Sequence, residues 1–196
     1  MRHLQHSIIS LCIALASFTA SAQSTTEVLS ADRMLDVRTG RLINKPSILI
    51  RDGRIVEVAS NGASVNAPAD ARHIDLPGMT LLPGLIDMHV HLDADPLYGG
   101  YNSLQFGDRF WSILMVPHAE KTLDAGFTTV RNVGADAWND VGLMQAIDEG
   151  KIKGPRVVPA TYSFGATGGH CDSTFFPPSM DEKSAYNADS PEEGRK

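Results

Sequence analysis

The sequence predicts an α/β protein in which a β-rich segment precedes a parallel β/α region. Two observations predict the second region: an apolar strand after Pro83-Gly84, and the strand–helix–strand–helix–strand order that follows it. Short strands broken by turns over residues 28–82 predict the β-rich segment. The apolar content of 42% and the net charge of −6 are those of an ordinary globular protein. No basic cluster indicates a nucleic acid or an anionic membrane as a partner.

Residues 1–22 have the features of a secretory signal peptide. Arg2 precedes a short apolar run, residues 8–16, and Ala20-Ser21-Ala22 closes the segment. The run is shorter than the ~20 residues that span a bilayer. We therefore expect cleavage after Ala22, an exported protein (periplasmic or secreted) and no membrane partner after cleavage. The mature chain then keeps one cysteine, Cys171, and forms no internal disulfide.

Residues 23–82 are predicted to form a small β-sandwich. Strands over residues 47–50 and 55–58 flank Asp52-Gly53, which suits a tight hairpin turn with positive φ. A Gly/Ala/Pro/Asn-rich linker follows, and a further strand over residues 72–76 precedes the β/α region.

Residues 83–196 begin with the strand around which the chain is organised. Alternate side chains of a strand share a face, which places Asp87, His89 and His91 together. Polar groups on a buried face need partners, and a metal best fits two imidazoles on one face. The tripeptide alone also occurs by chance on surfaces or as hydrogen-bonded core residues. The opposite face is apolar and is expected to pack under helices; its residues are Ile86, Met88, Val90 and Leu92.

The elements after this strand alternate between helix and strand. Residues 108–126 have apolar positions at roughly helical spacing, and residues 127–134 form a β-branched second strand. Residues 140–149 predict a second helix and residues 155–160 a third strand. This order supports a parallel barrel.

Two loops are predicted to overhang the carboxyl ends of these strands. Residues 93–106, rich in Asp, Gly, Tyr and Pro, form either a substrate lid or a solvated loop whose tyrosines pack on the rim. In residues 163–172, glycines permit a close backbone approach to a ligand and place His170 at the same rim.

The string from Pro83 to Leu92 resembles the first barrel strand of the metal-dependent amidohydrolase superfamily. The similarity runs from about Val28 to the last residue and is greatest to the imidazolonepropionase-like and Xaa-Pro dipeptidase-like branch. It implies that residues 83–196 are the first three strands of a (β/α)8 TIM barrel and residues 23–82 the N-terminal part of a composite sandwich. A whole barrel takes about 250 residues, so we expect this sequence to be an N-terminal portion.

The resemblance also implies a zinc site, binuclear in the full-length family, with other divalent metals as substitutes. His89 and His91 are the implied metal ligands, and Asp87 would orient one imidazole as a hydrogen-bond acceptor. His170 is implied to contact substrate; a metal ligand or a loop residue without a catalytic part are the alternatives. Asn132 stands where the family commonly has an aspartate, which leaves any electrostatic role there open. The family's bridging lysine, two later histidines and catalytic aspartate have no counterpart in this sequence.

The implied activity is hydrolysis of a C–N bond in an amide, a dipeptide or a cyclic amide. The substrate would be a small-molecule or peptide amide, and an oligomer is compatible with this function. The alternative is a non-catalytic exported binding or interaction module derived from an amidohydrolase. Three barrel strands cannot close, so unpaired edges and apolar faces should promote association, and two neutral imidazoles should hold zinc weakly.

Overall fold

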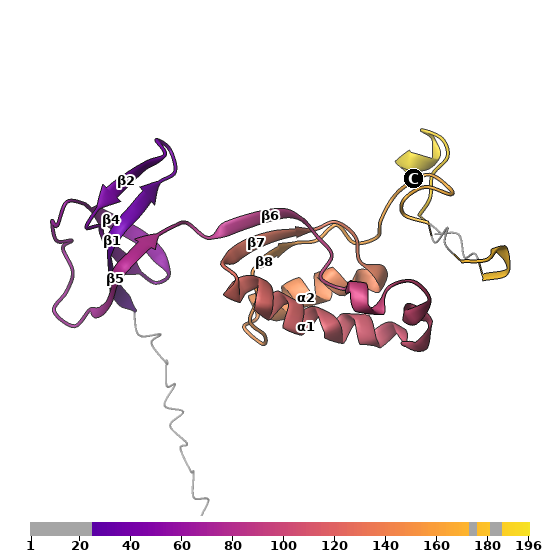
Figure 1. The fold of residues 1–196 in the computed structure, drawn as a ribbon, viewed down its shortest axis with the longest axis horizontal. Coiled ribbons are helices and arrows are strands. Elements are labelled where there is room, and N and C mark those ends of the chain that lie inside the picture. The colour runs from indigo at the N-terminus through magenta and orange to yellow at the C-terminus, as the bar shows by residue number, and fades with distance from the viewer. Residues whose placement is uncertain (1–24, 173–175, 181–185) are drawn as a thin grey trace, which may run out of the picture. The chain divides into compact units, whose positions relative to one another are not determined.

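The computed structural model describes residues 25–172, 176–180 and 186–196. The signal-peptide prediction for residues 1–22 lies outside these residues. The chain divides into two compact units, Met1–Leu82 and Pro83–Lys196. The described part of the first contains strands alone and the second contains strands and helices, so the chain as a whole has the predicted α/β composition (Figure 1). Among the helices of the described residues, none combines the length and the apolarity that crossing a bilayer requires.

The N-terminal unit contains one five-stranded sheet built around its first strand, β1. The amino-terminal part of β1 pairs antiparallel with β3 and its carboxyl-terminal part with β2, while β5 runs parallel to it. The fourth strand, β4, pairs with β3. The strands are β1 (Thr26–Asp36), β2 (Arg41–Asn44), β3 (Ser47–Arg51), β4 (Arg54–Ala59) and β5 (Arg72–Leu81).

The predicted hairpin between β3 and β4 is confirmed. Asp52 and Gly53 form its turn with φ of 50° and 71°, the positive values that a two-residue hairpin turn of this kind requires. Val28 of β1, Leu49 of β3 and Ala71 just before β5 form the core of this unit. A set of apolar side chains on β4 stays exposed: Ile55, Val56 and Val58.

The C-terminal unit contains a parallel sheet with the strand order β6-β7-β8. Helix α1 packs against β7 and α2 against β8, and Figure 1 shows both helices on the same face of the sheet. The predicted alternation of strand and helix is confirmed. The elements are β6 (Leu85–Val90), α1 (Asp108–Asp124), β7 (Phe127–Asn132), α2 (Asn139–Asp148) and β8 (Arg156–Val158), with short 3-10 helices at Pro96–Tyr98, Gly100–Gln105, Asp136–Trp138, Pro178–Met180 and Glu193–Arg195.

Glycine at position 84 allows β6 to approach β7 closely. A Cβ atom built at Gly84 would overlap the side chain of Thr128 on β7. The amide of Leu85 donates to the carbonyl of Gly126, 2.8 Å away, at the same point. Gly84 is therefore needed for the first contact of the parallel sheet.

The core of this unit lies between the sheet and the two helices, and it covers only part of β6. The predicted burial of the apolar face is wrong for its first half, because Ile86 is 62% and Met88 56% exposed, whereas Leu92 is 4% exposed. The reason is that β6 is an edge strand, while α1 packs on β7 and α2 on β8. The fully buried part of the core is made of Leu92, Met115, Ala119, Val130, Leu143 and Val157.

Candidate functional site

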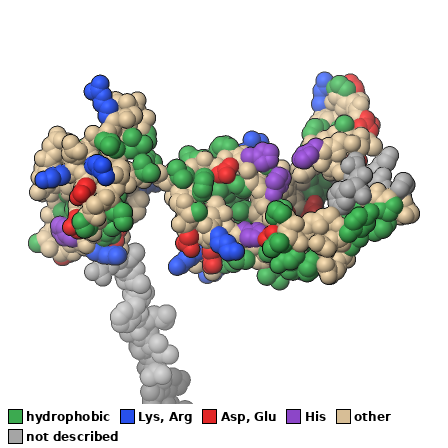
Figure 2. Space-filling view, viewed as in Figure 1, with side chains coloured by type: hydrophobic (Ala, Val, Ile, Leu, Met, Phe, Trp, Pro, Cys, Tyr) green, Lys and Arg blue, Asp and Glu red, His purple; other side chains and the backbone are tan. Residues whose placement is uncertain are grey.

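The end of β6 and the loop after β8 line a shared pocket of about 360 Å³. His89 and His91 enter it from β6 and the residue just beyond it, and His170 enters from the loop. All three histidines are exposed, and histidine side chains gather on one face of this unit in Figure 2. The structure thus brings together the three histidines predicted for the site. The remaining lining residues are Val133, Ser163, Cys171 and Asp172.

The two strand histidines lie side by side. Their ring centroids are 5.5 Å apart and the rings meet edge to face at 72°. Side chains two residues apart on a strand share a face, which explains the proximity. Two imidazoles at this spacing are suited to approach one ion from neighbouring directions.

A backbone carbonyl lies within hydrogen-bond distance of the His91 ring. Its Nδ1 lies 3.4 Å from the carbonyl oxygen of Gly134. Because a carbonyl can only accept, this contact is a hydrogen bond in the tautomer that has its proton on Nδ1, and that tautomer leaves the Nε2 lone pair for a metal or a proton. Gly134 is required for this geometry: its φ is +149°, and a Cβ there would overlap the Ser163 hydroxyl.

Asn132, at the end of β7, supports this contact from below. It is fully buried; its Nδ2 donates to the same Gly134 carbonyl at 2.9 Å, and its Oδ1 accepts from the amide of Leu92 at 2.8 Å. The side chain uses a donor and an acceptor at once, which a carboxylate cannot do. The amide at this position therefore has a structural role that the sequence left open.

Asp87 contacts the backbone of the histidine strand. Its Oδ1 accepts from the amide of His89 at 3.0 Å. This contact stiffens the strand between the two residues. The orientation of an imidazole by Asp87 stays a prediction.

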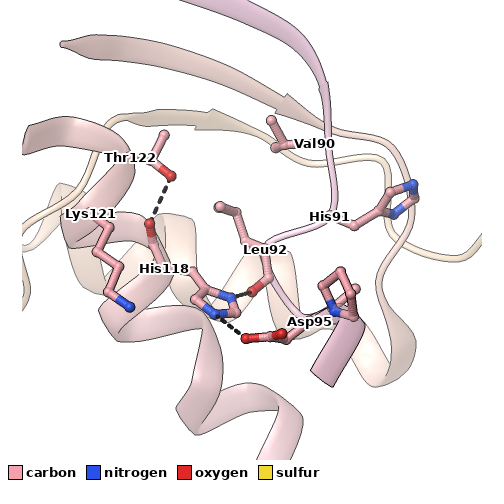
Figure 3. Close-up of a pocket in the computed structure, with 9 residues that line it drawn as sticks. Val90, His91, Leu92, Asp95, His118, Lys121 and Thr122 are labelled. Atoms are coloured by element: carbon pink, nitrogen blue, oxygen red, sulfur yellow. Dashed lines mark hydrogen bonds and ion pairs between the residues drawn. The ribbon is translucent and has the colours of Figure 1, made fainter. Parts of the chain in front are cut away.

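A second hollow, of about 350 Å³, lies between the chain segment that follows β6 and helix α1, around His118 (Figure 3). The imidazole Nδ1 is 2.8 Å from the carbonyl oxygen of Leu92, and Nε2 is 3.5 Å from Oδ2 of Asp95. The sequence pattern favoured a surface or helix-packing role for His118. No sequence pattern indicated these two contacts, because they join His118 to residues 26 and 23 positions earlier in the chain.

Two carboxylates, one fully buried and one half-buried, were also missed by the sequence reasoning. Asp140, fully buried at the start of α2, accepts from the amides of Ala160 and Thr161 at 3.0 and 2.9 Å and so holds the loop after β8. Burial raises the pKa of the Asp93 carboxyl, and the nearby charge of Asp136 adds to the effect. Neither residue belongs to a motif that would indicate burial.

The loop after β6 has a packed half and an exposed half, and its role as a substrate lid stays a prediction. Tyr98 packs edge to face on Phe106 and Phe110, at 5.1 and 5.2 Å between ring centroids, so it is a rim residue. Tyr101 is exposed, and its ring meets Phe176 at 5.5 Å. The packed half of the loop is thus distinct from the exposed half.

The metal-ligating set is partial. Across residues 25–172, 176–180 and 186–196, no three His, Cys, Asp or Glu side chains converge closely enough to hold an ion. Catalytic zinc normally takes three protein ligands. The His89/His91 pair fits two of them.

Comparison with known proteins identifies the fold and the family. The Amidohydrolase family profile matches residues 80–195. A solved Xaa-Pro dipeptidase with bound methionine is 29% identical, with a TM-score of 0.74 over 86% of this chain and 42% of that one. A prolidase complexed with N-methylphosphonate-L-proline is 34% identical, with a TM-score of 0.67 over 82% of this chain and 37% of that one.

Curated sequences give the same relationship over shorter segments. A 5-methylthioadenosine/S-adenosylhomocysteine deaminase of Saccharophagus degradans is 43% identical over 65 residues, 33% of this chain and 15% of the deaminase. A dihydroorotase of Syntrophus aciditrophicus is 35% identical over 97 residues, 46% of this chain and 22% of that enzyme. The chain therefore spans less than a quarter of either relative. Because the family profile covers more than half of its residues, the chain belongs to the amidohydrolase family.

Proposed function

We propose that this chain is the N-terminal portion of a metal-dependent hydrolase that cleaves C–N bonds, and that His89 and His91 bind its metal. One observation carries the proposal: two imidazoles lie with their ring centroids 5.5 Å apart at one pocket, and Nδ1 of one of them, His91, lies 3.4 Å from the Gly134 carbonyl oxygen. This arrangement is unnecessary for a surface histidine and suits a metal ligand. Membership of the amidohydrolase family supports it.

Each site residue has a separate part in the proposal. His89 and His91 would hold zinc or a similar divalent ion, one of two in the complete protein, and Asp87 would steady the histidine strand. The chemistry that such an ion supplies is Lewis-acid activation of a carbonyl and of water. His170, exposed at the pocket rim, would contact the substrate.

The fold proposal extends the two observed units. The sheet β6-β7-β8 would be the first three strands of a (β/α)8 barrel, because its edge strand β6 carries exposed apolar side chains that further elements would cover. The five-stranded sheet would be the N-terminal part of a β-sandwich, since Ile55, Val56 and Val58 are exposed there. We further propose an exported protein with a cleaved leader at residues 1–22, and self-association of the 196-residue chain.

The proposed substrate class is a small-molecule or peptide amide. The similar solved structures include a dipeptidase with methionine and a prolidase with an N-methylphosphonate-L-proline ligand. The curated relatives include a dihydroorotase and a 5-methylthioadenosine/S-adenosylhomocysteine deaminase. A dipeptide panel with cyclic amides as a second group is the matching assay.

The test compares three substitutions in the longest form of the protein that the gene encodes. His91→Ala should remove metal and turnover together, because it deletes a ligand. His170→Ala should keep the metal and lower kcat/KM, because its contact is with substrate. His73→Ala, on an exposed position of β5, is the control. Metal content by plasma emission and turnover of the panel are measured, and full metal occupancy in His91→Ala would refute the proposal.

A further inference from the structure

Strand β6 ends at Val90, one residue before His91, so the sheet itself does not hold the backbone at His91. The last ladder contact is the amide of Val133 donating to the carbonyl of Val90 at 3.0 Å. Beyond it, the two backbone polar groups of Leu92 bond to side chains instead of to a strand. Side chains from β7 and α1 therefore make the backbone hydrogen bonds next to His91 that a neighbouring strand would make within a sheet.

These side chains hold Leu92 from both sides. Asn132 Oδ1 accepts from its amide at 2.8 Å, and His118 Nδ1 lies 2.8 Å from its carbonyl oxygen. The amide of Leu92 belongs to the same rigid peptide plane as the carbonyl of His91. Asn132 thus fixes the plane that follows His91, and His118 fixes the next one. The Leu92 side chain is itself buried in the core.

His118 also ties the following loop to helix α1. Its Nε2 is 3.5 Å from Oδ2 of Asp95, and Oδ1 of Asp95 accepts from the amide of Leu97 at 2.9 Å, at the start of the 3-10 helix Pro96–Tyr98. In Figure 3 the His118 ring bridges Leu92 and Asp95, while the His91 ring points away from it. The imidazole of His118 therefore acts on the strand end from the side opposite to the candidate metal site.

We propose that His118 is a positioning residue for the histidine pair: by donating from Nδ1 to the Leu92 carbonyl, it completes with Asn132 a clamp that sets the direction of His91. The proposal deepens the proposed function and rests on it for the metal. The donor atom carries the effect. Asparagine at position 118 places its Nδ2 near the position of Nδ1, whereas phenylalanine keeps the ring volume without a donor.

The experiment uses the 196-residue chain and its variants His118→Asn and His118→Phe, with His73→Phe in the N-terminal unit as control. Cobalt(II) affinity is measured by competition with a chelator. His118→Phe should weaken cobalt binding about tenfold, and His118→Asn should stay within about twofold of the parent, the scale of effects seen when a contact that orients a metal ligand is lost or kept. Equal cobalt affinities for the two variants would overturn the proposal, because they would show that the hydrogen-bond donor at position 118 has no effect on the metal site.

A metal-free measurement separates this proposal from the metal site itself. In ¹⁵N NMR spectra of the chain without metal, the His91 ring and the Leu92 amide should give one sharp set of signals in the parent and in His118→Asn. In His118→Phe they should broaden or split, and the Leu92 amide should exchange faster with solvent. If the parent fails to bind cobalt while these differences appear, the metal proposal fails and the clamp stands. Signals that are the same in all variants would remove the clamp.

Discussion

The two halves of strand β6 and its extension differ in how completely this chain satisfies them. At the carboxyl end, Leu92 is buried and both of its backbone polar groups are hydrogen-bonded. In the first half, Leu85, Ile86 and Met88 are all largely exposed. The carboxyl end of this segment is therefore packed and hydrogen-bonded, and its first half presents an apolar surface.

The difference separates what forms the candidate site from what completes the fold. The contacts that orient His91 come from β7 and α1, both in the same unit as β6. The exposed apolar side chains need neighbours that the described helices do not supply, because α1 and α2 pack on β7 and β8. The contacts that orient His91 are thus present within this unit, whereas a cover for the exposed apolar side chains of β6 is not.

The largest expected effect comes from a pair of methionines on the two sides of this comparison. Met115 of α1 is fully buried, whereas Met88 of β6 is 56% exposed. Met115→Ala should lower the free energy of unfolding by about 2–5 kcal/mol through lost burial and a cavity. Met88→Ala should change it by less than about 0.5 kcal/mol. Urea unfolding followed by tryptophan fluorescence reports this unit alone, because Trp111 and Trp138 are the only tryptophans of the chain. Equal losses would contradict the description of β6.

A smaller loss is expected for the buried carboxylate that holds the loop after β8. Asp140→Ala leaves the amides of Ala160 and Thr161 without their acceptor. Hydrogen bonds to a charged group contribute about 1.5–3 kcal/mol, so we expect a loss of roughly 2 kcal/mol in the same unfolding experiment. Asp108→Ala, at an exposed position of α1, is the matched control. Loss of equal size in the control would show that the effect is not specific to the loop contacts.

The exposed half of β6 should affect association more than folding. Replacing Ile86 and Met88 together by lysine puts charges on the apolar surface, which should reduce self-association of the 196-residue chain. The free energy of unfolding should change by less than about 1 kcal/mol, since both positions are exposed. Light scattering measures the mass, and Val37→Lys in the N-terminal unit, also at an exposed apolar position, is the control. An unchanged mass in the double variant would mean that another surface drives association.

The smallest expected effect is a pH dependence at Asp93, beside the histidine end. Burial raises the pKa of this carboxyl above its ordinary 3.8. The folded state then binds more protons than the unfolded state, so Asp93 lowers stability as pH rises from about 3.8 through the folded pKa. Asp93→Asn should therefore gain stability relative to the parent at pH 7 and lose this gain near pH 3.5. Unfolding curves at both pH values measure it, and a relative gain confined to the acidic sample would reverse the assigned sign.

The sequence predicted local elements well where the pattern alone decides them. The Asp52-Gly53 turn and the alternation of strands and helices from β6 to β8 are confirmed, because turn chemistry and apolar spacing act over short distances. The predicted burial of Ile86 and Met88 was wrong, because an apolar pattern shows which face of a strand is hydrophobic and not whether a helix packs on it.

The candidate site divides in the same way. Strand periodicity places His89 beside His91, and the structure has the two rings 5.5 Å apart. The roles of His118 and Asn132 were out of reach, since each depends on a hydrogen bond to Leu92 across 26 and 40 residues of sequence. Hydrogen bonds between residues so far apart in the sequence produce no periodic pattern from which they could be predicted.

The most direct test of the central claim is the number of imidazole nitrogens around a metal bound to the chain. X-ray absorption spectra of the cobalt- or zinc-loaded 196-residue chain should show two histidine ligands. The His91→Ala variant should show one ligand or release the metal, while His73→Ala should match the parent. Spectra that keep two histidine ligands in His91→Ala, or that show only water around the metal in the parent, would contradict the assignment of His89 and His91.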